Sequence, residues 1–218
     1  MTVFGRVLRT MCRCGAALLL GGYLVASFAA VDDDYKSALQ AYNRGDMATA
    51  INTLRKSADS GHAPSQALLA YILDQSDYDE EAVVYFRKAA EQGNADGEYG
   101  LGRMYTSGEG VKRDIQEGRR WILKAAQRGH VLATAVIAQA YIKGELGITE
   151  SERVSETAHQ WIRRAAENDH VPSLEHLAAG YRKGINGFAV DLKQAEFYEA
   201  RVKQVKGVTQ KPPAKRKN

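Results

Sequence analysis

The feature that most constrains the fold of this 218-residue chain is a short segment that recurs four times. Each copy carries a basic residue, two small residues and, soon after, a glycine or an aspartate that can end a helix. The copies occupy residues 56–63, 88–95, 124–131 and 164–171, at spacings of 32, 36 and 40 residues. Periods of this size are typical of stacked supersecondary units that bury their apolar faces against one another.

Each copy lies between two segments with helical periodicity. The segment before it has an Ala-x-x-aromatic-x-x-basic pattern, as in Ala82, Tyr85 and Lys88. The segment after it repeats small and apolar residues at steps of four, one and three, which places them on one helical face. We therefore predict about five helix pairs, A then B. The A helices are expected to start near residues 34, 63, 96, 132 and 172, and the B helices near 46, 79, 114, 154 and 191.

Residues suited to capping stand at the expected helix ends. An aspartate before a helix can accept a hydrogen bond from a backbone N–H of the first turn, and a glycine after a helix can adopt the left-handed conformation. The predicted N-terminal caps are Asp46, Asp114 and Asp191, and the predicted terminators are Gly61, Gly93 and Gly129. These signals predict an all-α protein.

The repeat is similar to a known family. Residues 95–129 read ADGEYGLGRMYTSGEGVKRDIQEGRRWILKAAQRG. This segment resembles the Sel-one-like repeat family, a branch of the tetratricopeptide-type α/α repeats, and the resemblance extends over about residues 34–202. It implies a right-handed α/α superhelical solenoid with a concave inner surface, and an adaptor role in assembling protein complexes, often in the bacterial envelope. It identifies no partner, because fold alone does not fix function.

The units of this solenoid are expected at residues 34–62, 63–94, 95–130, 131–170 and 171–205, within a repeat domain of residues 30–206. The fourth unit has four extra residues between Gly144 and Trp161, compared with the interval from Gly108 to Trp121 in the third. We expect the resulting loop, Glu145–Glu156, to protrude locally.

The first 29 residues differ from the rest. Three arginines precede an apolar stretch, and small residues follow it, the pattern of a secretory signal peptide cleaved after Ala29. The mature protein is then periplasmic or secreted. The alternative is an uncleaved segment that anchors the chain in the inner membrane. Both cysteines, Cys12 and Cys14, lie in this segment, so a cleaved chain has neither a disulfide nor a thiol nucleophile.

The basic pI of about 9.0 reflects the two ends of the chain. Without the three N-terminal arginines and the six cations from Lys203 onward, the formal charge of +4 falls to −5. Nucleic acid is therefore not an expected partner. Residues 207–218 have the composition of a disordered basic tail. This tail could touch an anionic envelope surface weakly, and a solubilising role is the simpler interpretation.

No motif for catalysis or cofactor binding is present: the sequence lacks Gly-x-Ser-x-Gly, His-Glu-x-x-His and a phosphate-binding loop. His62, His130 and His170 each directly follow a helix terminator, in equivalent positions of different units that lie roughly 10 Å or more apart. They cannot share a metal ion that needs ligands at about 2 Å, and we interpret them as turn or packing residues. We expect no enzymatic activity, no cofactor and no metal.

A partner protein is expected to bind the concave face, where exposed aromatics and arginines often dominate binding. The predicted contact residues are Tyr71, Asp74, Tyr99, Arg103, Gln139, Ile142, Glu175 and Arg182. The alternative for Tyr71 and Tyr99 is packing between repeats. The sequence thus favours a protein-binding scaffold of the bacterial envelope. Two alternatives remain open: a secreted virulence-type factor that binds a host protein, and an envelope hydrolase or its activator.

Overall fold

The structure is a computed structural model that describes residues 31–209, and the regular elements in that range are all helices. Residues 31–43 are helical, and this segment is called the first helix below. The chain continues through α2 (Met47–Asp59), α3 (Ala63–Asp74), α4 (Asp79–Glu91), α5 (Ala95–Ser107), α6 (Ile115–Gln127), α7 (Val131–Lys143), α8 (Glu150–Arg153), α9 (Glu156–Glu167), α10 (Val171–Lys183) and α11 (Leu192–Thr209). The predicted all-α fold class is confirmed.

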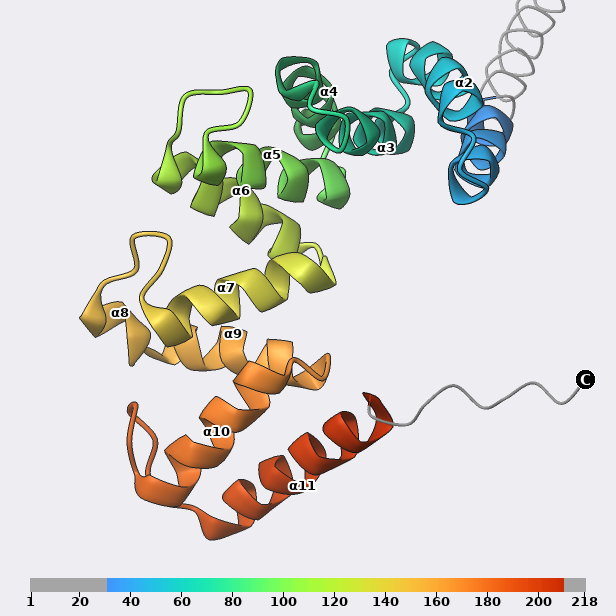
Figure 1. The fold of residues 1–218 in the computed structure, drawn as a ribbon. Helices are drawn as coiled ribbons and strands as arrows, with labels where there is room; N and C mark the ends of the chain where they lie inside the picture. Colours follow the sequence, from blue (N-terminus) through green and yellow to red (C-terminus); the bar gives the residue numbers. More distant parts are fainter. Residues whose placement is uncertain (1–30, 210–218) are drawn as a thin grey trace, which may run out of the picture.

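The helices form successive antiparallel pairs along an open arc (Figure 1). The A helices are the first helix, α3, α5, α7 and α10, and the B helices are α2, α4, α6, α9 and α11. From α2 onward, each of these helices begins within two residues of the position expected from the repeats. The connections after α5, α7 and α10 lie on the same edge of the arc, at the left in Figure 1. The longer connection of the fourth unit contains the short helix α8.

The predicted caps are confirmed. The side chains of Asp46, Asp114 and Asp191 each accept a backbone N–H in the first turn of the following helix. Gly61, Gly93 and Gly129 have φ angles of +98°, +77° and +92°. These are left-handed values that most residues with a Cβ adopt only with strain. In the fourth unit this position is held by Asp169, with φ of +59°.

The third unit packs its two helices most closely where each carries a glycine. A Cβ on Gly102 of α5 would lie 2.9 Å from the backbone oxygen of Gly118 in α6 and 2.6 Å from Ile122. A Cβ on Gly118 would lie 2.7 Å from the backbone oxygen of Gly102. Side chains at either position would push the helices apart. The small residues of the repeat therefore set the spacing within the pair.

Buried hydrophobic residues form two clusters that follow each other along the arc. One extends from the first helix to α5 and includes Leu54, Leu69 and Leu101. The other extends from α6 to α10 and includes Ile137 and Ile162. Each helix pair contributes to a core shared with its neighbours, as expected for units that cannot bury an apolar face alone.

The same polar contact joins three successive unit boundaries. In each case an arginine on a B helix donates to the hydroxyl of a tyrosine on the next A helix. The three pairs are Arg87 with Tyr105, Arg119 with Tyr141, and Arg163 with Tyr181, at 2.9, 3.5 and 3.5 Å. Each guanidinium is also about 6 Å from an aromatic ring of the next unit. These contacts fix the register between units.

The structure also bears on the two ends of the predicted domain. Helix α11 runs through Thr209, three residues beyond the boundary at residue 206 expected from the sequence. The remainder of the predicted tail and the predicted signal peptide lie outside the described residues. Within residues 31–209, none of the helices combines the length and apolar character needed to cross a membrane.

Candidate functional site

A cavity of about 250 Å³ lies on the A-helix face of the first four units. Four consecutive A helices contribute to it: the first helix, α3, α5 and α7. Its lining is mainly aromatic and apolar, with Tyr35, Tyr71 and Tyr99 among the aromatic residues. Tyr71 is 41% exposed, although it is a large side chain with a substantial apolar surface. The polar groups of the cavity are Asp96, Arg103 and His130.

His130 connects the cavity to the repeat architecture. It is the N-cap of α7, where its Nδ1 accepts the backbone N–H of Ala133 at 3.0 Å. Its ring stacks on Tyr99 at a centroid distance of 4.6 Å, and its Nε2 is 3.2 Å from Asp96. An Nδ1 that accepts a hydrogen bond carries no proton, so the ring is the neutral tautomer with its proton on Nε2. That proton is donated to Asp96.

His62 has a similar arrangement two units earlier. It is the N-cap of α3, and its Nδ1 accepts the backbone N–H of Ser65. Its Nε2 lies 3.1 Å from Asp32, and its ring meets Tyr35 edge-on at 5.6 Å. His170 begins α10 in the third equivalent position, where its Nδ1 contacts the hydroxyl of Ser173. The interpretation of these histidines as turn and packing residues is confirmed.

Asp96 and Asp74 differ in how their charges are balanced. The side chain of Asp74 is 6% exposed, and its Oδ2 lies 3.3 Å from Nη1 of Arg103, with which it forms an ion pair between α3 and α5. Asp96 receives a hydrogen bond from a neutral imidazole, and that bond lowers the pKa of its carboxyl. Asp96 is therefore ionised at neutral pH without a cation beside it.

The eight predicted contact residues divide into two groups. Tyr71, Tyr99 and Arg103 line the cavity together, and Asp74, which is not part of the lining, forms an ion pair with Arg103. The remaining four are spread along α7 and α10. Ile142 packs against the second hydrophobic cluster, and Gln139 is half-buried, with its Oε1 lacking a hydrogen-bond partner. Glu175 and Arg182 border a separate groove of about 370 Å³ between α10 and α11.

Of the charged residues of that second groove, Glu175 and Arg182 each pair with a residue of α11. Arg182 donates through two nitrogens to Glu199 of α11, at 2.6 and 2.9 Å. Glu175 accepts from Lys206 at 2.5 Å. The charges of Glu175 and Arg182 are thus used within the last unit, whereas the first cavity presents an uncompensated carboxylate. Its exposed carboxylate and its position across four consecutive A helices make the first cavity the candidate site.

Sequence reasoning did not include Tyr35, Asp96 and His130 in the site. The repeat pattern placed His130 correctly at a helix start, but it did not show that the ring stacks on the preceding A helix. Tyr35 lies in the first unit, which departs most from the repeat pattern. Neither the stacking of His130 on Tyr99 nor the position of Tyr35 in the cavity wall leaves a periodic signal in the sequence. Both depend on how one unit is rotated against the next.

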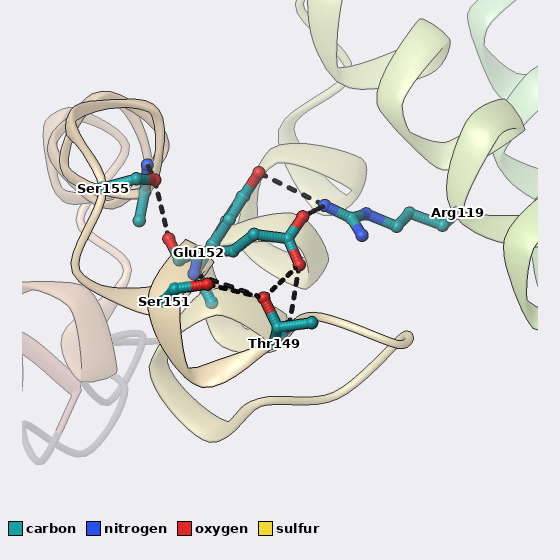
Figure 2. A network of polar contacts seen from close by, with 7 residues as sticks. Arg119, Thr149, Ser151, Glu152 and Ser155 are labelled. Carbon is teal, nitrogen blue, oxygen red and sulfur yellow. Dashed lines mark hydrogen bonds and ion pairs between the residues drawn. The ribbon is translucent and has the colours of Figure 1, made fainter.

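The inserted loop of the fourth unit is held by a polar network around Glu152 (Figure 2). Its carboxylate accepts the backbone N–H and the hydroxyl of Thr149, at 2.7 and 2.9 Å, and Nη2 of Arg119 at 3.0 Å. These bonds lower the pKa of Glu152 to about 2. The loop is therefore tied to α6 of the preceding unit.

Among the described residues, no group of three or more histidine, cysteine, aspartate or glutamate side chains could hold a metal ion. His159 is buried, stacks on Phe188 at 4.0 Å and contacts the backbone oxygen of Asn186 at 2.8 Å. It fastens the connection between α10 and α11, which is a structural role.

Comparison with known families matches the Sel1 repeat at residues 63–94, 95–130 and 132–170. These three segments correspond to units two to four. The chain is 32% identical over 83 residues to the DAP3-binding cell death enhancer 1 of Rattus norvegicus, and 34% identical over 62 residues to the exopolysaccharide production negative regulator of Rhizobium meliloti. These matches cover 37% and 28% of this chain, but only 16% and 23% of those proteins.

Solved structures extend the likeness to most of the chain. A protective antigen of uropathogenic Escherichia coli with an SLR fold is 29% identical, with a TM-score of 0.69, over 82% of this chain and 39% of that one. A Sel1 repeat protein of Oxalobacter formigenes is 25% identical, with a TM-score of 0.65, over 80% of this chain and 73% of that one. The solenoid architecture is shared across both comparisons.

Proposed function

The chain carries Sel1 repeats between residues 63 and 170, and from this premise we propose that it is a non-enzymatic adaptor that holds a segment of a partner protein. Proteins built from such repeats generally mediate protein–protein interaction. The observation that carries the proposal is the cavity shared by four consecutive A helices. It is concave and largely apolar and carries a few convergent polar groups, which are the features expected of a binding site.

Export to the bacterial envelope is the second part of the proposal. It is supported by the N-terminal sequence, where three arginines precede an apolar stretch that ends in small residues. The partner is then an envelope protein, and the mature adaptor works in the periplasm. The Rhizobium relative is named as a regulator of exopolysaccharide production, which is a process of the cell surface.

A secreted factor that binds a host protein is the alternative. Its support is the likeness to the Escherichia coli protective antigen. The same cavity would serve in both cases, and the two proposals differ in where the mature protein accumulates.

Crosslinking and capture from fractionated cells tests these proposals, with the tagged full-length chain expressed in its own host. We expect recovery from the periplasm with one stoichiometric envelope protein. Recovery mainly from the medium without an envelope partner would favour the secreted alternative. A catalytic activity of the purified chain would contradict the non-enzymatic role.

Substitution of one exposed tyrosine tests the role of the cavity directly. Tyr71→Ala should reduce partner capture at least about tenfold, the loss of about 1.4 kcal/mol typical of an aromatic anchor. The melting temperature should change little, because Tyr71 is partly exposed. Tyr78→Ala is the matched control, since Tyr78 is exposed but lies outside the cavity. Equal capture by both variants would show that the partner binds elsewhere.

A further inference from the structure

The net charge is unevenly divided along the solenoid. Residues 31–110 contain 14 acidic and 7 basic residues, a net charge of −7, whereas residues 111–207 contain 12 acidic and 16 basic residues, a net charge of +4. The cavity lies mostly in the acidic part, on the first helix, α3 and α5. A field of this sign attracts cationic segments and repels anionic ones.

Within the cavity, the local charge has the same sign. The ion pair of Asp74 and Arg103 contributes no net charge. The neutral ring of His130 donates a hydrogen bond to Asp96 without cancelling its charge. The carboxylate of Asp96 also remains accessible, with 76% of the side chain exposed. One uncompensated negative charge therefore stands at the opening of the cavity.

Aromatic rings surround this charge. The ring of Tyr99 stacks on that of His130. Burial, and to a smaller extent the nearby carboxylate of Asp96, raises the pKa of the Tyr35 hydroxyl. Tyr71 is the third tyrosine of the lining. Aromatic faces beside a carboxylate form a favourable environment for an organic cation, which gains from the ring quadrupoles and from the ion pair.

We propose that the cavity accepts an arginine or lysine side chain from a basic segment of the partner protein, with its cation at Asp96 and its aliphatic stem between the tyrosine rings. This inference rests on the proposed function, and it adds the chemistry of the partner. Tyr71, Tyr99 and the apolar floor receive the methylene groups, while the acidic surroundings speed the approach of the segment.

Binding of three labelled hexapeptides to the full chain tests the proposal by fluorescence anisotropy. The probes are hexaarginine, hexaglutamate and an uncharged alternating serine–leucine peptide. We expect hexaarginine to bind most tightly. Asp96→Asn should weaken its binding about tenfold, the effect of removing a charge-assisted hydrogen bond of about 1.4 kcal/mol.

Two further variants separate a specific site from diffuse attraction. Glu80→Gln removes one negative charge from the exposed surface of α4, outside the cavity, and should change the affinity for hexaarginine less than twofold. Tyr71→Leu should weaken binding about threefold, and Tyr71→Phe should retain it, because only phenylalanine keeps the aromatic face. Glu80→Gln, Tyr71→Leu and Tyr71→Phe all leave the contact between His130 and Asp96 in place.

The outcomes distinguish this inference from the proposed function. Tighter binding of either other probe, or equal effects of Asp96→Asn and Glu80→Gln, would overturn the cation site. If partner capture depends on Tyr71 but not on Asp96, the adaptor role stands and the cation site is rejected. If capture depends on neither residue, both proposals fail.

Discussion

Glu98 of α5 carries a carboxylate into the protein interior, where its side chain is 1% exposed. Nε of Arg128, at the end of α6, lies 3.1 Å from both carboxylate oxygens. The buried carboxylate is tolerated while Arg128 stays in place, because the attraction between the two charges offsets the cost of removing the carboxylate from water. The pair joins the two helices of the third unit at the end opposite their connecting loop.

Removal of Arg128 is expected to destabilise the protein strongly. Arg128→Met leaves the carboxylate of Glu98 buried without a cation and should lower the free energy of unfolding by about 3 kcal/mol. Urea denaturation at pH 7 measures this loss. The control is Arg201→Met, which breaks the pair with half-exposed Asp169 and should cost less than about 1 kcal/mol. Similar losses in both variants would show that Glu98 does not need Arg128.

At the scale of an element, the short helix α8 illustrates how an insertion is stabilised without a core of its own. None of its four residues is buried. Its first turn is closed by a capping box, in which Thr149 and Glu152 each satisfy a backbone N–H of the other. The ion pair with Arg119 then attaches the loop to the previous unit (Figure 2).

The low pKa of Glu152 predicts how this attachment depends on pH. The pKa falls from 4.5 to about 2 in the folded chain, so the contribution of Glu152 to stability is complete above pH 4.5 and is lost as the pH falls towards 2. Glu152→Gln should therefore have a lower urea midpoint than the unchanged chain at pH 6, and this difference should disappear near pH 2. A difference that persists at pH 2 would contradict the assignment.

Glu145→Gln provides the matched control in the same loop. Glu145 is exposed and lies 3.8 Å from exposed Lys143, a pair of the kind that contributes little to stability. Its urea midpoint should match that of the unchanged chain at both pH values.

At the scale of the whole molecule, the units interact with their neighbours and not across the arc. Helices α4, α6 and α9 each pack against the A helices on either side, and packing over a longer range joins successive A helices such as α3 and α5. In such an array, a local loss of stability spreads through the nearest interfaces first. The two hydrophobic clusters are the natural cooperative regions.

Hydrogen exchange in paired cavity-forming variants tests this prediction. Ile162→Ala and Leu54→Ala each remove a fully buried side chain and should cost about 2–5 kcal/mol. Ile162→Ala should increase exchange most in α7, α9 and α10, and Leu54→Ala most in α2 and α3. A uniform increase in both variants would indicate a single cooperative unit instead.

The sequence by itself determined the repeat, the helix pairs and the caps, because these depend on interactions between residues fewer than about ten positions apart. Asp114 before α6 and Gly129 after it act locally, and their spacing recurs in each unit. Three of the predicted contact residues, Tyr71, Tyr99 and Arg103, line one cavity, and their role in binding stays a prediction. Only the tertiary structure brought Tyr35, Asp96 and His130 to that site. Their contacts depend on the rotation between units, which is set by packing such as the approach of Gly97 in α5 to the backbone of Ala90 in α4, and side-chain periodicity carries no record of that angle.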